Sequence, residues 1–516
     1  MSYELVWFKR DLRWQDHAAL AQAAQRGPVR CIYVVEPELW LQPDAALQHF
    51  EFVRESLQTL DDALHLQGGC VEVHTGEVPD VLSRIWQEAP FRRLHAHQET
   101  GNSFTYARDL RVGAWCQAHK VGWHEYPQFG VVRALKNRNL WQAAWERHMA
   151  EPLQHVGELL FWQPPLHALS RTDWYLPSKM QAPGHLQHNP PLRQRGGRPL
   201  ALATLHSFLN SRSLGYRGGI SSPLSAPDAC SRLSAYLAWG CISMREVVQE
   251  TRIHIHQLPP HASRHRAGLT AFISRLYWHC HFIQKLESEP AIEWQNMHRG
   301  YDGLREHDFN EAHFEALKAA RTGWPMVDAC VTMLRETGWL NFRMRAMLVS
   351  VAAYPLWLHW RPVGQWLATQ FLDYEPGIHW SQLQMQSGTT GINTTRVYNP
   401  VKQAQDHDPQ GRFVRQWLPA LQQVPDTWLF EPWRMPHTMQ THLGVFVMPQ
   451  PLVDLAQATR EAKQRLHSRR QTDEVKAAKK AVVDKHASRK NWGVRPKASR
   501  ASAAQQTGKE QLGFDF

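Results

Sequence analysis

Long hydrophobic runs are missing from this sequence. No stretch of eighteen apolar residues occurs, which excludes a transmembrane helix. The N-terminal segment MSYELVWFKRDLRW carries charges where a signal peptide needs an apolar core. We therefore predict a cytoplasmic protein that has no membrane partner.

Cysteines are few and scattered: there are seven, an odd number, and no two form a C-x-x-C pair. A disulfide framework and a zinc ribbon are poorly supported, so we interpret the cysteines as reduced thiols. No cysteine follows Cys330, which excludes a cysteine-ligated iron–sulfur cluster in the C-terminal third. His279 and His281 could suggest a metal pair, but residues two apart do not share a helix face, so we predict no metal site.

Several nucleotide and catalytic motifs are also absent. The sequence contains no G-x-x-x-x-G-K-[ST] loop, no G-x-G-x-x-G, no H-E-x-x-H and no G-x-S-x-G. These absences argue against a P-loop NTPase, a dinucleotide-binding Rossmann motif, a zinc metalloprotease of that type and an α/β-hydrolase.

The composition is that of a globular protein with more than one domain. Of 516 residues, 43% are hydrophobic and 20% are charged, and one compact core rarely holds so long a chain. Most of the net charge of +11 lies near the C-terminus, where residues 457–516 carry 15 Lys and Arg against 6 Asp and Glu. The 23 tryptophans are unusually many, and they suit core packing, stacking on bases or a flavin, or electron hopping.

Hydrophobic periodicity divides the chain into four parts. Through residue 130, short apolar runs alternate with helical stretches, which predicts a doubly wound α/β domain. Residues 131–199 form a connector that becomes rich in Pro, His and Gln. Residues 200–455 have a period near 3.6, which predicts an all-α domain. Residues 456–516 form a basic, largely disordered tail, in which an Ala/Lys/Arg-rich helical stretch is expected to about Lys490. The expected strands are 5–8, 31–35, 70–76, 93–97 and 121–126.

Five motifs resemble sequence blocks of the DNA photolyase and cryptochrome family and occur in that family's order. The first two are VWFKRDLRWQDHAAL (Val6–Leu20) and SRLSAYLAWGCISMREV (Ser231–Val247). The others are TGWPMVDACVTMLRETGWLNFRMR (Thr322–Arg345), YNPVKQAQDHDPQGRFVRQWLPAL (Tyr398–Leu421) and EPW (Glu431–Trp433). The resemblance implies an α/β antenna-type domain followed by a connector and a helical FAD-binding domain.

The resemblance also implies where FAD would bind. The run Ser231-Arg232-Leu233-Ser234 opens a helix, where hydroxyl and free N–H groups suit a pyrophosphate; an ordinary serine cap is the alternative. Arg345 and Asp373 match a pair that lies over the flavin ring in the family, and a structural ion pair is the alternative. Cys230 stands where the family usually has Thr or Ser. The full predicted set is Tyr216, Cys230, Ser231, Arg232, Leu233, Ser234, Arg345, Asp373 and Glu375.

Trp278 matches an indole that stacks against the damaged base in the family. The surrounding pattern departs from the family, because Arg275 stands where typical repair enzymes have a glutamate that contacts a cyclobutane dimer. Asn341-Phe342 likewise stands where the family has His-Asn. Specificity for a cyclobutane dimer therefore does not follow from the resemblance.

Trp360 and Trp380 are the predicted electron carriers. Trp360 matches the middle tryptophan of the family's chain, whereas the distal position holds Leu317. Trp380 lies one position from the family's proximal tryptophan, and an ungapped alignment places Ser381 there instead. Core packing is the alternative role, and two further tryptophans could offer another route: Trp324 and Trp357.

Light-driven DNA repair is the function that the resemblance favours, with a reduced flavin passing an electron to a pyrimidine lesion. A cryptochrome-type photoreceptor without repair activity is the alternative, and a light-independent flavoprotein that binds nucleic acid is a third. The antenna slot near Phe104-Thr105 could hold a deazaflavin, a lumazine, a folate or nothing.

The C-terminal segment carries two further predictions. The basic stretch Arg460–Arg500 is expected to bind nucleic acid in a salt-sensitive way, with a solvated surface helix as the alternative. The last six residues, Gln511–Phe516, have the pattern Q-L-x-Φ-x-Φ, which resembles the peptides by which bacterial repair proteins bind the sliding clamp. Folding back onto the protein's own surface is the alternative.

Overall fold

The N-terminal domain is built on a parallel five-stranded sheet. The computed structural model describes residues 2–162, 187–392, 396–443 and 450–486. Strand order in the sheet is β3-β2-β1-β4-β5 with every pair parallel, so the predicted doubly wound α/β domain is confirmed. The strands are β1 (Glu4–Phe8), β2 (Val29–Val35), β3 (Val71–Thr75), β4 (Arg93–His97) and β5 (Gly122–Tyr126).

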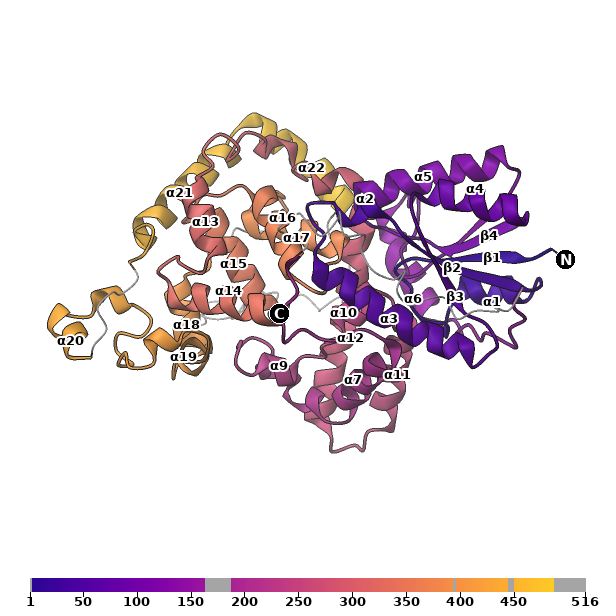
Figure 1. The fold of residues 1–516 in the computed structure, drawn as a ribbon. Coiled ribbons are helices and arrows are strands. Elements are labelled where there is room, and N and C mark those ends of the chain that lie inside the picture. The colour runs from indigo at the N-terminus through magenta and orange to yellow at the C-terminus, as the bar shows by residue number, and fades with distance from the viewer. Residues whose placement is uncertain (1, 163–186, 393–395, 444–449, 487–516) are drawn as a thin grey trace, which may run out of the picture.

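Helices cover both faces of this sheet (Figure 1). Side chains along β1 alternate between the faces, as a strand requires: Val6 and Phe8 join one core cluster, whereas Leu5 and Trp7 join another. The first cluster includes residues of α1 and α3, and the second includes residues of α4 and α5. The helices of the domain are α1 (Ala18–Ala24), α2 (Pro37–Trp40), α3 (Leu47–His65), α4 (Val78–Glu88) and α5 (Ser103–Ala118).

The second domain is helical, as predicted. Its longest helix, α12 (Ser263–Ser288), packs against α17 (Pro376–Ser387), and Gly377 is needed there because a Cβ would lie 2.6 Å from the Cα of Ile283. A second hydrophobic core gathers around α14 (Pro325–Thr337), α15 (Phe342–Ala353) and α16 (Trp360–Gln370). The remaining helices of this domain include α7 (Arg198–Asn210), α8 (Tyr216–Gly219), α9 (Ala226–Ala229), α10 (Ser234–Ala238), α11 (Met244–Gln257), α13 (Glu311–Lys318), α18 (Pro400–His407), α19 (Arg412–Trp417) and α20 (His437–His442).

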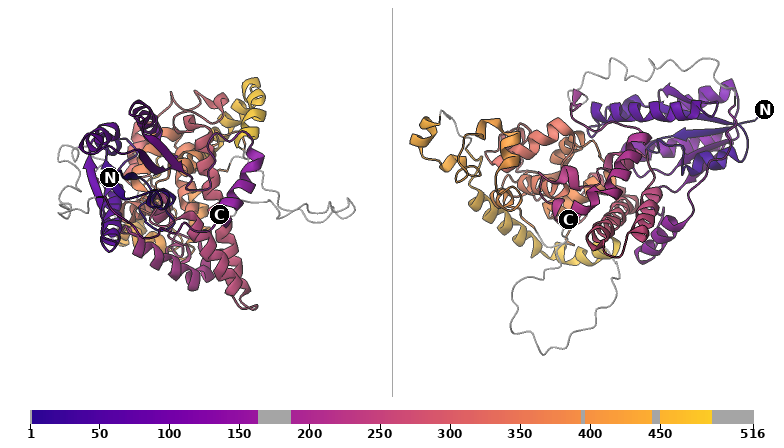
Figure 2. Two further views of the ribbon diagram at one scale, coloured as in Figure 1. Left: turned by 90° about the vertical axis from the view of Figure 1, so that its right-hand side faces the viewer. Right: turned by 90° about the horizontal axis from the view of Figure 1, so that it is seen from below.

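Two C-terminal helices, α21 (Leu455–Arg470) and α22 (Asp473–His486), run along the outside of the helical domain (Figures 1 and 2). Ala462 and Leu466 of α21 are buried against Ala353 and Tyr354, so the first part of the basic segment packs on the domain. The rest of the predicted tail, including Gln511–Phe516, lies outside the described residues. Among the described residues, no helix combines the length and hydrophobicity that a bilayer crossing requires.

Candidate flavin site

A cavity that is open to solvent, with about 1490 Å³ of empty space including its mouth, lies between helices of the second domain. Its walls come from α10, α12, α15, α17 and the segments that join them. Gly338, in the left-handed conformation at φ +64°, ends α14 and lets residues 339–341 turn along the wall. Eight of the nine predicted cofactor residues line this one cavity: Tyr216, Cys230, Ser231, Arg232, Ser234, Arg345, Asp373 and Glu375. Leu233 is instead buried in a neighbouring core.

Arg345 and Asp373 form a two-pronged ion pair at the cavity wall. The Nη1 and Nη2 groups of Arg345 donate to the two carboxylate oxygens of Asp373, each at 2.9 Å. Burial alone would raise the pKa of Asp373, but the charge and hydrogen bonds of Arg345 outweigh it and hold that pKa below its ordinary value. The Nε group of Arg345 also donates to the Leu340 carbonyl at 2.6 Å, so the guanidinium plane is fixed.

The Arg232 guanidinium forms no ion pair with a carboxylate of the described residues, although the charge of Asp373 acts on it through space. Its backbone is in the left-handed region at φ +62°, and its guanidinium lies 3.8 Å from the ring centroid of Trp339. Burial lowers the pKa of Arg232 to about 10, and within the described residues no carboxylate pairs with it. Ser231 and Ser234 line the cavity beside it. This donor set fits a buried anion such as the pyrophosphate of FAD.

Glu375 is a buried acid whose pKa is raised toward neutral pH. Its Oε2 atom lies 3.3 Å from Nη2 of Arg10, which the N-terminal domain contributes. Burial nevertheless outweighs this cation and raises the pKa of Glu375 to about 7. Arg10 also donates to the Tyr374 carbonyl at 2.8 Å, so the α/β domain helps to shape the cavity wall.

Two histidines that the sequence did not single out as flavin ligands also line the cavity. Burial lowers the pKa of both His279 and His379 to about 4, so both imidazoles are neutral. Nε2 of His379 lies 2.8 Å from the Gly364 carbonyl, which makes Nε2 the protonated nitrogen and Nδ1 an acceptor. The signal that could have found them was the departure from the family's motifs at these two positions.

The predicted lesion residues share this cavity. Trp278 and Arg275 both line it, on the α12 wall. Trp278 meets His281 edge-on at 4.9 Å between ring centroids and is tilted against Phe282 at 5.9 Å. Arg275, which departs from the family's pattern, therefore lies in the same cavity as the predicted flavin ligands.

The two predicted electron carriers lie together outside the cavity wall. Trp360 and Trp380 are fully buried, with ring centroids 6.0 Å apart. Trp380 donates its indole N–H to the Tyr374 hydroxyl at 3.1 Å, and Tyr374 lines the cavity. Leu317 is fully buried, and Ser381 lies on the same helix as Trp380.

Of the two alternative tryptophans, Trp357 is poorly suited to carry a positive hole. Trp357 has two guanidinium groups near its ring, Arg305 at 4.5 Å and Arg465 at 5.0 Å from the centroid. Positive charge at these distances opposes removal of an electron from the indole. Trp324 is fully buried in the second core cluster.

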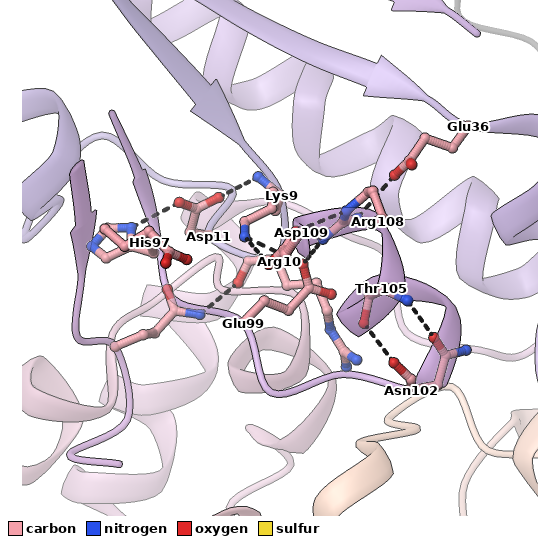
Figure 3. A network of polar contacts seen from close by, with 12 residues as sticks. Lys9, Arg10, Asp11, Glu36, His97, Glu99, Asn102, Thr105, Arg108 and Asp109 are labelled. Carbon is pink, nitrogen blue, oxygen red and sulfur yellow. Dashed lines mark hydrogen bonds and ion pairs between the residues drawn. The ribbon is translucent and has the colours of Figure 1, made fainter. Parts of the chain in front are cut away.

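A second, smaller cavity of about 670 Å³ opens at the carboxyl ends of β1 and β2. Four residues that line it, Lys9, Glu36, Glu99 and Arg108, belong to a network of buried ions (Figure 3). Arg108 donates to Glu36 at 2.9 Å, to Glu99 at 2.7 Å and to Asp109 at 2.8–2.9 Å, and Lys9 donates to Asp109 at 3.1 Å. Of the antenna positions named from sequence, Thr105 lines this cavity and Phe104 does not, while Tyr374 lies in the walls of both cavities.

Asp11, His17 and His97 form a buried cluster beside this network, with ligand atoms within 4.8 Å of one another. Hydrogen bonds fill the coordination positions. Nδ1 of His17 accepts from the Leu20 backbone N–H, so Nε2 carries the proton and donates to Asp11 at 2.9 Å. His97 Nδ1 lies 2.7 Å from the same oxygen. The cluster is thus explained as a structural hydrogen-bond group.

Comparison with known proteins agrees with this architecture. Residues 4–134 match the family model described as DNA photolyase, and residues 272–468 match the one described as the FAD binding domain of DNA photolyase. A cryptochrome DASH from Gloeobacter violaceus is 26% identical over 488 residues, which cover 88% of this chain and 93% of that protein. A deoxyribodipyrimidine photo-lyase from Streptomyces griseus is 27% identical over 479 residues, covering 89% and 98%.

Solved structures show the same fold. A class III photolyase from Agrobacterium tumefaciens has a TM-score of 0.77 at 21% identity, covering 92% of this chain and 98% of that one. An archaeal photolyase from Sulfolobus tokodaii, whose structure holds two FAD molecules, has a TM-score of 0.73 at 23% identity, covering 90% and 99%.

The chain belongs to the DNA photolyase and cryptochrome superfamily, as its motifs predicted, and its helical domain is an FAD-binding domain of the photolyase type. Relatives named photolyase and relatives named cryptochrome match it at nearly equal identity, so membership leaves both activities open.

Proposed function

We propose that this protein is an FAD-dependent, blue-light-driven DNA repair enzyme that acts on a pyrimidine lesion. The observation that carries the proposal is one cavity whose lining combines cationic and hydroxyl side chains with aromatic ones. Arg232, Ser231 and Ser234 would hold the FAD phosphates, with Tyr216 and Cys230 beside them. FAD, once bound and reduced, supplies the electron that splits the lesion.

The protein's own groups position the reactants and control charge. The Arg345–Asp373 pair fixes a guanidinium at the cavity wall that would stabilise an anionic flavin ring, and Glu375 would supply an acceptor near it. Because His279 and His379 are neutral, they add no positive charge to this wall. Their acceptor nitrogens can order a polar ligand.

The damaged nucleotide must leave the base stack to reach this cavity. Trp278 offers it an aromatic face, and base–aromatic stacking contributes about 1–3 kcal/mol per base. Arg275 adds a cation where a carboxylate would be typical, so it should select for lesions with exposed carbonyl acceptors and favour the extra negative charge that follows electron transfer.

The test is lesion removal by the reduced, FAD-loaded protein. Oligonucleotides that carry either a cyclobutane dimer or a (6-4) photoproduct are incubated in light and in darkness, and lesion loss is scored. We expect light-dependent loss of one lesion, slowed in Trp278→Ala when the protein is limiting, and unchanged in a matched control, Trp86→Phe, on α4. Loss of neither lesion in light would contradict the proposal.

A cryptochrome-type photoreceptor is the second candidate, and Arg275 is the observation that favours it, because the usual dimer contact is missing. In that case neither lesion disappears, but illumination changes how α21 and α22 pack on the helical domain. Hydrogen exchange of residues 455–486 in light and darkness distinguishes the two functions.

A second chromophore in the smaller cavity, at Thr105, and docking of residues 511–516 on a sliding clamp are further proposals of the same kind. A tether to the clamp would raise the enzyme's local concentration at DNA. Titration of a peptide spanning Gly508–Phe516 against a bacterial clamp tests the second idea. It fails if nothing binds up to millimolar peptide, or if binding survives joint replacement of Gln511, Leu512 and Phe516 by alanine.

A further inference from the structure

Tyr374 lies in the partition between the two cavities. It follows Asp373 and precedes Glu375, it lines both cavities, and its side chain is 6% exposed. Its hydroxyl reaches away from the flavin side toward Asp44 of the N-terminal domain, at 2.6 Å from Oδ2. One aromatic ring thus connects the flavin cavity with a carboxylate of the other domain.

The hydrogen bonds at Tyr374 have a fixed direction. An indole N–H can only donate, so Trp380 donates to the Tyr374 oxygen at 3.1 Å. The phenolic proton is then directed at Asp44, whose carboxylate also accepts from the Asn102 side chain at 3.1 and 3.2 Å. Tyr374 therefore rests as a neutral phenol with a base already in contact with its proton.

The surroundings oppose loss of that proton while the ring is intact. Burial and the negative charges of Asp44 and Glu293 raise the pKa of Tyr374 well above its usual value. The same negative charges favour removal of an electron from the ring, and an oxidised phenol is a strong acid. A buried tyrosine beside a carboxylate is thus stable at rest and ready to lose an electron and a proton together.

We propose that Tyr374 is a redox-active residue that donates an electron to the photoexcited oxidised flavin, with Asp44 as its proton acceptor. One electron leaves the phenol for the flavin. The Tyr374 O–H bond breaks, and its proton passes to Oδ2 of Asp44. The products are a neutral tyrosyl radical, a neutral Asp44 carboxyl group and a flavin reduced by one electron. Return of the electron and the proton restores the starting state.

Neither neighbouring tryptophan has a carboxylate in contact with its N–H group, as the Tyr374 hydroxyl has. The Trp380 N–H faces the neutral Tyr374 oxygen, and the Trp360 N–H donates to the amide oxygen of Asn296 at 2.8 Å, so neither indole faces a carboxylate. A hole on either indole would remain a cation in an apolar region, which is costly. Because the distal position of the family's chain is Leu317 and fully buried here, a hole has no indole there to continue outward, and Tyr374 is where it settles.

Electron paramagnetic resonance of the full-length, FAD-loaded protein tests this inference, which rests on the proposed flavin site. Samples containing ordinary or ring-deuterated tyrosine are illuminated in the oxidised state without added reductant. We expect an organic radical signal that narrows on tyrosine deuteration and is unchanged by tryptophan deuteration. The signal should disappear in Tyr374→Phe, which keeps the ring, and persist in Tyr33→Phe, a buried tyrosine at the smaller cavity.

Asp44→Asn separates proton acceptance from packing. It keeps a side chain of the same shape but removes the base, so the tyrosyl yield should fall about 100-fold, the scale of general-base catalysis, and its solvent deuterium isotope effect should vanish. A signal that responds to tryptophan deuteration alone, or a tyrosyl signal that survives Tyr374→Phe, overturns the inference. Flavin content distinguishes the failures: a protein without FAD refutes the flavin site as well, whereas a loaded protein without a tyrosyl radical refutes this inference alone.

Discussion

The two cavities each contain an arginine, Arg108 in the smaller one and Arg232 in the flavin cavity, and the two charges are paired differently. At the smaller cavity, Arg108 is held by Glu36, Glu99 and Asp109, all within hydrogen-bonding distance. At the flavin cavity, Arg232 lies over an indole and pairs with no carboxylate among the described residues. An arginine that is already paired with carboxylates stabilises the protein's own fold. An arginine without such a partner can instead pair with the charge of a bound ligand.

Removal of Arg108 should have the largest effect on stability. Arg108→Met leaves three buried carboxylates without their shared cation, and breaking such a buried group typically costs roughly 3–5 kcal/mol. Urea unfolding of the apo-protein measures the loss. Arg252→Met, at a partly exposed pair with Glu146, is the matched control and should cost less than about 1 kcal/mol. An equal loss of unfolding free energy in Arg108→Met and Arg252→Met would contradict the claim that the Arg108 network stabilises the fold.

Glu375 should make the apo-protein less stable as the pH rises. Its pKa is raised from 4.5 to about 7, so the folded state favours the protonated acid. The stability from this group is complete below pH 4.5 and is lost as the pH rises through 7, with a total on the order of 3 kcal/mol. Glu375→Gln removes the titration, so the difference between wild type and variant should follow this curve. A flat difference from pH 4.5 to pH 8 would count against it.

Arg232 should matter to the cofactor and not to the fold. Arg232→Met deletes a half-buried cation that forms no ion pair within the described residues, so the apo-protein should unfold at an equal or higher urea concentration. FAD affinity should fall by about ten- to a hundredfold, because a hydrogen bond to a charged group contributes about 1.5–3 kcal/mol. Fluorescence titration with FAD, compared with Arg108→Met, sharpens the contrast. A destabilised apo-protein with normal FAD affinity would reverse our assignment.

Trp278 should contribute to substrate and not to FAD. Its indole lines the cavity on the α12 wall, and loss of one stacked base costs about 1–3 kcal/mol. Trp278→Ala should therefore retain its flavin and bind lesion-containing DNA roughly tenfold more weakly, as measured by fluorescence anisotropy. Flavin loss with unchanged DNA affinity would make Trp278 a core residue.

Much of the fold and of the phosphate-binding wall could be predicted from the sequence. Strand and helix periods are local properties, and Ser231–Ser234 lies within one motif of adjacent residues. Arg345 and Asp373 were named from separate matched positions, and the structure brings them together. The assignment of these residues to FAD remains a prediction that the variants above test.

The rest of the site depends on contacts between distant segments. Tyr374 meets Asp44 across 330 residues, and Arg10 reaches Tyr374 and Glu375 from the other domain. Periodicity and motifs are local patterns, so they do not record which side chains meet across such long stretches of sequence. The acceptor role of His379 likewise follows from its contact with the Gly364 carbonyl and not from its neighbours in sequence.

A crystal structure of the FAD-loaded protein tests the central claim most directly. We predict one FAD per chain in the cavity of about 1490 Å³, with its phosphates against Ser231, Arg232 and Ser234 and its ring against the Arg345–Asp373 pair. The ion network at the smaller cavity should keep its present contacts. FAD bound in the smaller cavity, or phosphates that leave Arg232 unpaired, would contradict the account.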